Sequence, residues 1–191
     1  MRVPLTQFHS AATAFGAALL SILLTAAPLA AQSPEEMDSL FSELSSQQGD
    51  GWMRAQSDIE RIWSRSGSAA LDLLLMRGEA ALDAGDVPAA IGHLTALTEN
   101  APGFAAGWAA RAVAFQLAGE TGPAMADLAQ ALRLEPRHWP SVTLLATILE
   151  DMGDTDRALA AYRESLAINP HQEEAEDGVA RLMAESQGRD A

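Results

Sequence analysis

The chain has 191 residues, of which 26 are Asp or Glu and 12 are Arg, with no Lys and no Cys, and its formal net charge is −14. The lack of Cys excludes disulfides, zinc–thiolate sites, thiol nucleophiles and Cys-linked lipids. Such a negative chain repels phosphate, so we expect no nucleic-acid partner. With 48% apolar residues, the chain can bury the core of one ordinary domain.

Residues 1–31 have the pattern of a secretory signal peptide. Arg2 supplies a basic start, an apolar run of 17 residues occupies 11–27, and small residues follow up to Ala31. This order is typical of export signals that are removed after Ala30 or Ala31. Because an exported chain without Cys suits a bacterial periplasm, we expect a periplasmic protein. The alternative is an uncleaved membrane anchor, because the run is near the minimum length for a bilayer span.

Residues 32–70 predict a helical hairpin. Apolar residues recur at helical spacing in two stretches, and Gly49 and Gly51 mark a turn between them. The stretches are Met37, Leu40, Phe41 and Leu44, followed by Trp52, Ala55, Ile59, Ile62 and Trp63. We interpret this hairpin as a degenerate repeat or a cap, because its sequence matches the later repeats only poorly.

From residue 71 the sequence repeats with a period of 34 residues, which defines three units at 71–104, 105–138 and 139–172. Several columns of prolines, glycines and small residues keep this interval in phase, which excludes coincidence. They are Pro102, Pro136 and Pro170; Gly85, Gly119 and Gly153; Ala90, Ala124 and Ala158; and Gly78, Ala112 and Ala146.

Each unit predicts two helices. In the second unit, Trp108, Ala112 and Phe115 share one helical face, and Gly119 suits the left-handed residue that ends a helix. Pro123 then fits the first turn of the next helix, where its missing N–H costs nothing. The small columns allow helices to approach closely, and a large side chain there would cost about 1–3 kcal/mol.

Residues 173–186 predict a final capping helix, followed by a frayed tail at 187–191. Apolar residues at Ala175, Val179, Leu182 and Met183 form one stripe with acidic residues outside it. A stack of repeats needs such a polar-backed cap for solubility.

These columns resemble the tetratricopeptide repeat (TPR) family, in the 34-residue period, the small and aromatic positions and the terminal proline. The resemblance covers the three units and is strongest in the second, with Trp108, Ala112, Phe115, Gly119 and Pro136. It departs at Ala81, where the family usually has an aromatic residue, and at Val142, where Trp is common. It implies an all-α, right-handed solenoid with the hairpin before it and the capping helix after it.

No motif in the sequence predicts catalysis, a cofactor or a metal site. His93, His138 and His171 lack a second ligand at metal-site spacing, and the last two are expected to be exposed loop residues at repeat junctions. The acidic turn from Asp151 to Asp156 lacks the twelve-residue calcium-loop pattern, and its acids are better explained as helix caps. We therefore expect a chain that is not an enzyme and binds no cofactor.

The resemblance implies a partner-binding groove lined by the first helix of each unit. The family's best-known peptide sites clamp a terminal carboxylate with Lys, Arg and Asn, and none of these stands in the corresponding columns here. An acidic, partly apolar groove favours a basic or apolar segment. The implied groove residues are Asp72, Leu75, Glu79, Leu82, Asp83, Ala109, Val113, Gln116, Leu117, Thr143, Thr147, Glu150 and Asp151.

The sequence therefore predicts a non-catalytic protein-interaction scaffold of the bacterial cell envelope. One alternative is that the hairpin or the final helix fills the groove, so that another face binds the partner. The others are a membrane-tethered assembly subunit with an uncleaved anchor, and a self-associating repeat protein.

Overall fold

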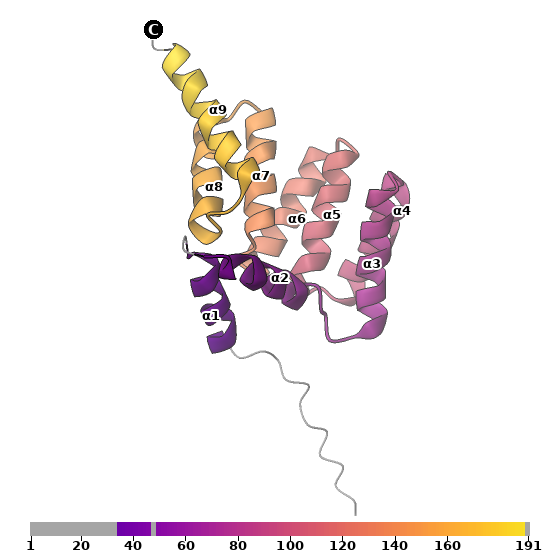
Figure 1. Cartoon of the computed structure of the whole chain (residues 1–191). Helices are drawn as coiled ribbons and strands as arrows, with labels where there is room; N and C mark the ends of the chain where they lie inside the picture. Colours follow the sequence, from indigo (N-terminus) through magenta and orange to yellow (C-terminus); the bar gives the residue numbers. More distant parts are fainter. Residues whose placement is uncertain (1–33, 47–48, 190–191) are drawn as a thin grey trace, which may run out of the picture. The chain divides into compact units, whose positions relative to one another are not determined.

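The described part of the chain is entirely helical, as predicted. The computed structural model describes residues 34–46 and 49–189, so the predicted signal peptide at 1–31 and its cleavage sites lie outside it. Within these residues there are nine helices and no strand, and no helix is long and apolar enough to span a membrane (Figure 1). The helices are α1 Pro34–Leu44, α2 Gly51–Trp63, α3 Ala69–Asp83, α4 Val87–Asn100, α5 Ala105–Leu117, α6 Thr121–Leu134, α7 Trp139–Asp151, α8 Thr155–Ile168 and α9 Glu173–Arg189.

Three helix pairs follow the 34-residue period: α3 with α4, α5 with α6, and α7 with α8. The two helices of each pair pack against each other, and α4 and α6 also contact the first helix of the next pair (Figure 1). The first helices, α3, α5 and α7, are therefore equivalent positions of one continuous stack.

The first helix of every pair ends at a glycine. Gly85, Gly119 and Gly153 have φ values of 72°, 75° and 77°, in the left-handed region that suits glycine. This conformation turns the next N–H back onto the helix, so that Asp86 N donates to Ala81 O at 2.8 Å. The other two ends form the same bond, from Glu120 to Phe115 and from Asp154 to Leu149. The helix end predicted at Gly119 is confirmed.

The small columns lie where helices approach most closely. Ala90, Ala124 and Ala158 are fully buried. A Cβ atom added at Gly78 would lie 2.5 Å from the Cγ of Leu94, so α3 and α4 pack together only because this position has no side chain. The predicted reason for the small residues is therefore confirmed at the level of packing.

The hairpin formed by α1 and α2 packs against the third helix pair and does not stack on α3 as a further repeat would. Its buried apolar face contacts Trp139 at the start of α7 and Ile168 at the end of α8. The Trp63 and Trp139 ring centroids are 4.6 Å apart, and Phe41 meets Trp139 edge-on at 6.2 Å. This aromatic cluster gives the hairpin an apolar interface with helices that lie far from it in the sequence.

Polar contacts fix the same interface at its edges. Arg137 donates to Asp38 at 2.7 Å, and Asn169 donates to Gln56 at 3.3 Å. The ring of His171 stacks on Trp52 with a centroid separation of 4.0 Å. The hairpin is therefore attached to the end of the third helix pair at which α7 begins and α8 finishes.

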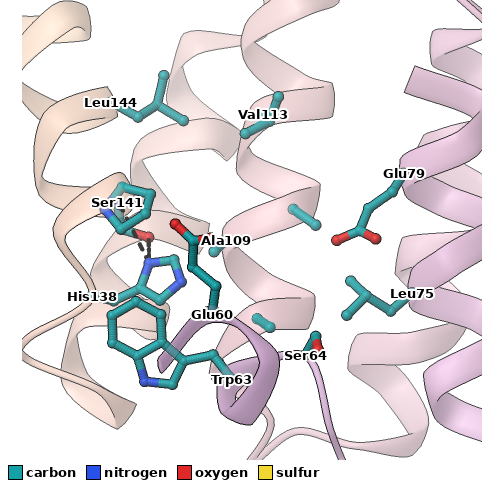
Figure 2. Close-up of a pocket in the computed structure, with 13 residues that line it drawn as sticks. Glu60, Trp63, Ser64, Leu75, Glu79, Ala109, Val113, His138, Ser141 and Leu144 are labelled. Atoms are coloured by element: carbon teal, nitrogen blue, oxygen red, sulfur yellow. Dashed lines mark hydrogen bonds between the residues drawn. The ribbon is translucent and has the colours of Figure 1, made fainter. Parts of the chain in front are cut away.

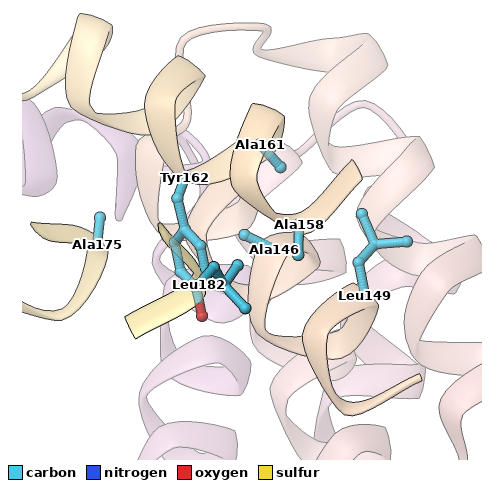
Figure 3. Packing of buried hydrophobic residues seen from close by; sticks show 7 residues of the cluster. All are labelled: Ala146, Leu149, Ala158, Ala161, Tyr162, Ala175 and Leu182. Carbon is cyan, nitrogen blue, oxygen red and sulfur yellow. The ribbon is translucent and has the colours of Figure 1, made fainter. Parts of the chain in front are cut away.

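The final helix, α9, covers the apolar face of α8. Ala175 and Leu182 are buried in a cluster with Tyr162 of α8 and with residues of α7 (Figure 3). The helix continues to Arg189, beyond the predicted boundary at 186.

Candidate functional site

Four of the predicted groove residues line one pocket. Leu75 and Glu79 come from α3, and Ala109 and Val113 come from α5 (Figure 2). The pocket has a volume of about 270 Å³. Its other lining residues belong to α2, α5 and α7 and the short segments beside them: Glu60, Trp63, Ser64, Ala106, Ala110, His138, Pro140, Ser141 and Leu144.

The pocket exists because the middle helix has small side chains at this level. Ala106, Ala109 and Ala110 of α5 form its floor, while Leu75 of α3 and Leu144 of α7 stand on either side. Interiors are close-packed, so an alanine opposite larger neighbours leaves space that a longer side chain would fill. The helix-pair stack thus produces an apolar recess at its centre.

The N-terminal hairpin borders the recess on its remaining side. Glu60 and Trp63 belong to the last turns of α2, and Ser64 follows directly (Figure 2). The sequence did not predict this wall, because only the docking of α2 on the third helix pair brings it to the groove. The hairpin forms a boundary of the groove here and leaves a pocket open beside it.

The charged groups of the pocket are carboxylates. Figure 2 shows the side chains of Glu60 and Glu79 extending into the space from opposite sides. Glu60 accepts a hydrogen bond from Gln56 at 3.0 Å, while Glu79 forms no hydrogen bond or ion pair among the described residues. The Glu79 side chain is exposed, but partial desolvation of its carboxylate, together with the negative charge of Asp83, raises its pKa above the usual value. Among the described residues, no Arg lines the pocket.

His138 is buried, although the sequence predicted an exposed loop residue. It precedes α7 as its N-cap, and its Nδ1 accepts a hydrogen bond from the backbone N–H of Ser141 at 3.3 Å. The Ser141 hydroxyl lies 2.8 Å from the same nitrogen, and the ring packs against Trp63. Burial lowers the pKa of His138 to about 4, so the ring is neutral near pH 7. Its place directly before Trp139 and Pro140, at a helix start, was the available sequence signal.

A second pocket of about 430 Å³ adjoins the first and shares Val113, Pro140 and Leu144 with it. It contains Thr143, another predicted groove residue, and extends to the start of α9. Its remaining lining residues are Gln56, Trp139, Asn169, His171, Gln172, Glu173 and Glu174. The two recesses together form a groove along α5 and α7, and α2 borders both.

The predicted groove residues of α7 are mostly engaged inside the fold. Thr143 is only 5% exposed, and its hydroxyl bonds to Ser165 and Gln172 at 2.6 and 2.8 Å. Thr147 lies 3.1 Å from the Tyr162 hydroxyl. These two threonines connect α7 to the helices beneath it and leave little for a partner to contact.

Glu150 is neutralised by a residue that the predicted groove omitted. Arg181 of α9 donates to both of its carboxylate oxygens, at 2.6 and 2.9 Å, and Tyr162 donates to it as well. These bonds, Arg181 foremost, lower the pKa of Glu150. An Arg from outside the predicted groove columns thus pairs with the groove at this end, because α9 packs back against α7. Asp151 remains exposed and lies within 3.4 Å of the Gln116 amide.

The other predicted residues lie outside the two pockets. Asp72 accepts hydrogen bonds from the Ser66 backbone N–H and hydroxyl, at 2.7 and 2.5 Å, so it fixes the turn before α3. Leu82 packs in the apolar cluster between α3 and α4. Asp83 and Leu117 are exposed near the ends of their helices. The structure thus concentrates the site on the central turns of α3 and α5.

The described residues contain no group of three or more His, Asp or Glu side chains that could hold a metal ion. The acidic turn before α8 has a local role: Asp154 accepts from the Arg157 backbone N–H at 3.3 Å and pairs with its guanidinium. This is a helix cap.

Two sequence comparisons identify relatives. The tetratricopeptide repeat family model matches residues 140–172. A TPR repeat-containing protein of Rhizobium etli is 30% identical over 158 residues, which cover 82% of this chain and 77% of that protein.

Solved structures share the fold at low sequence identity. The first TPR of Spaghetti (RPAP3) bound to the HSP90 peptide SRMEEVD has a TM-score of 0.58 at 18% identity and covers 63% of this chain and 94% of its own. MamA has a TM-score of 0.58 at 19% identity and covers 83% of this chain and 88% of its own. The likeness extends in the second case over most of the described helices.

Proposed function

The chain belongs to the tetratricopeptide repeat family, and on that premise we propose that it is a non-catalytic interaction scaffold that binds a segment of a partner protein. Members of the family generally mediate protein–protein interactions. The observation that carries the proposal is the groove along α5 and α7, with its two adjoining pockets and the exposed apolar side chain of Val113 between them. Apolar recesses beside a few polar groups are the usual form of a binding surface.

The partner segment is basic or apolar. Glu60 and Glu79 face the first pocket, and Glu173 and Glu174 face the second. Complementary charge steers association and suppresses wrong partners, so an acidic tail would be repelled here. The solved TPR of Spaghetti holds a peptide, which supports a peptide as the ligand class, but that peptide is acidic and the carboxylates of this groove would repel it.

The scaffold acts in the bacterial cell envelope after export. This part of the proposal rests on the signal-peptide pattern of residues 1–31. Sequencing the N-terminus of the protein isolated from cells tests it: Ala31 or Gln32 supports export and cleavage, while Met1 favours the membrane-tethered alternative.

Site-specific photocrosslinking in living cells tests the interaction. A photoreactive amino acid replaces Val113, which lies between the pockets, and in a matched strain it replaces Leu134 of α6. The two side chains are equally exposed, at 37%, and Leu134 lines neither pocket. We expect a discrete crosslinked partner from position 113 only.

Equal crosslinking from both positions, or none from either, would place the working surface elsewhere. A crosslink at position 113 to a second copy of this chain would instead favour the self-associating alternative. The exposed position of both residues keeps the two modified chains comparable in folding, because surface substitutions rarely change stability by more than about 0.5 kcal/mol.

A further inference from the structure

The first pocket is composite, because the N-terminal hairpin and the helix-pair stack both form it. Leu75, Ala109 and Val113 come from the helix-pair stack, while Glu60 and Trp63 come from the hairpin docked across it (Figure 2). In the third pair the equivalent residues are Thr143 and Thr147, whose hydroxyls are engaged in hydrogen bonds inside the fold. The pocket at the centre of the groove is therefore distinct in shape and in chemistry.

Its walls combine an apolar floor with uncompensated negative charge. Leu75, Val113 and the alanines of α5 supply the apolar surface, and Glu60 and Glu79 reach in from opposite sides. His138 also lines the pocket, but it contributes no positive charge near pH 7, because its Nδ1 serves as the hydrogen-bond acceptor that caps α7. A cation entering the pocket thus meets two carboxylates and no competing cation.

The size of the pocket limits its occupant. At about 270 Å³ it lies just below the range of ordinary small-molecule sites, which begin at about 300 Å³. A single long side chain fits this space better than a whole cofactor. Long basic side chains have an apolar stem and a charged head, which matches an apolar floor with carboxylates at its sides.

We propose that this composite pocket is a specificity pocket that takes one Arg or Lys side chain of the partner segment. The aliphatic stem lies along Leu75, Ala109 and Val113, and the cationic head lies between Glu60 and Glu79. The inference rests on the proposed function, because it names the chemistry that the groove selects.

The state of Glu79 supports this assignment. Its carboxylate has no hydrogen-bond partner among the described residues, and its surroundings disfavour the charged form, which raises its pKa. A bound cation would reverse that penalty. Partner binding should therefore be stronger at pH 7 than at mildly acid pH, where protonation removes the negative charge of Glu79.

The test uses a defined peptide as the probe. The pentapeptide Ala-Leu-Arg-Leu-Ala, acetylated and amidated at its ends, carries one cation between apolar residues. Its control contains citrulline in place of Arg, which keeps the shape and removes the charge. Binding to the isotope-labelled protein is followed by NMR chemical shifts, with the signals of Ala109 and Val113 as reporters. We expect saturable shifts with the Arg peptide and far smaller ones with the citrulline peptide.

Variants of the protein locate the effect. Glu79→Gln and Glu60→Gln should each weaken binding of the Arg peptide by about threefold to tenfold, as expected for one lost charge-assisted contact. Neither should change binding of the citrulline peptide. Glu99→Gln on α4 removes an equally exposed charge outside both pockets and should leave the affinity unchanged. Melting curves confirm that all three variants fold.

Specific outcomes overturn the inference. If the Arg and citrulline peptides bind equally, or if neither gives saturable shifts, the pocket does not select a basic side chain. If the Glu79→Gln and Glu60→Gln proteins bind like wild type, the cation binds elsewhere. In each case a crosslinked partner at position 113 would still support the groove as a binding surface, so the two proposals fail separately.

Discussion

Acidification should destabilise the protein through His138, before most carboxylates titrate. The ring is buried, and its Nδ1 accepts the hydrogen bond from Ser141 that caps α7. An imidazolium has no free acceptor, so protonation removes the cap and also places a charge in an apolar site against Trp63. The experiment therefore changes only the pH, and the His138→Asn protein serves as the reference. Asn can also cap a helix, but it does not titrate.

The magnitude follows from the shift in pKa. The folded protein lowers the pKa of His138 from 6.5 to about 4. The unfolded chain therefore binds a proton at a pH where the folded chain does not, so the free energy of unfolding is at its full value above pH 6.5 and decreases as the pH falls toward 4. At 1.36 kcal/mol per pH unit, a gap of about 2.5 units corresponds to about 3 kcal/mol.

Urea denaturation at several pH values between neutral and mildly acid conditions measures this effect. Glu150 and Asp154 also have lowered pKa values, so their contribution to stability is lost as the pH falls through and below the ordinary carboxylate range. Both remain in the His138→Asn protein, as does Glu60 in the neighbouring wall of the pocket. The difference between the two pH profiles thus isolates His138.

We expect the wild-type free energy of unfolding to decrease by about 3 kcal/mol more than that of His138→Asn between pH 6.5 and 4. The absolute stability of the variant at neutral pH is a separate quantity, because the substitution also removes the ring that packs on Trp63. Parallel profiles over this range would refute the assignment of His138 as a buried, neutral N-cap.

Two packing predictions use matched controls and thermal denaturation. Ala124→Leu should destabilise the stack by about 1–3 kcal/mol, because Ala124 is fully buried between α5, α6 and α7, while the exposed Ala126→Glu should change stability by less than about 0.5 kcal/mol; equal shifts in Tm would contradict the helix register. Gly178→Ala should also destabilise, since its Cβ would lie 2.6 Å from the buried Tyr162 ring, whereas Gly92→Ala, with open space around it, should stabilise α4 by about 0.5–1 kcal/mol. A stable Gly178→Ala protein would mean that α9 does not pack on α8 as described.

The repeat architecture could be predicted because its determinants are local. Each first helix ends through a hydrogen bond that spans only five residues, and the glycine that allows it recurs in every repeat, at Gly85, Gly119 and Gly153. The small columns are local in the same sense, because each one governs a contact between a helix and its immediate neighbour. The helix pairs can therefore be predicted from the period of the sequence.

The position of the hairpin could not be predicted, because its determinants are not local. Arg137 and Asp38 are separated by 99 residues, and His171 and Ser46 by 125. Amphipathic spacing predicts that Phe41 and Trp63 are buried, but it does not say against which surface. The same limit explains Glu150, whose partner Arg181 belongs to the final helix, and the spacing of apolar residues there does not say which acid it meets.

These non-local contacts are also what make one part of the groove different from another. The first helices of three similar repeats present similar faces, and a partner could slide between equivalent registers along them. Docking of α2 beside Ala109 encloses one recess with Glu60 and Trp63, while α9 neutralises Glu150 at the far end. The non-repeating ends of the chain thus make the first pocket chemically different from the rest of the groove, and a basic side chain of a partner meets there an apolar floor between the carboxylates of Glu60 and Glu79.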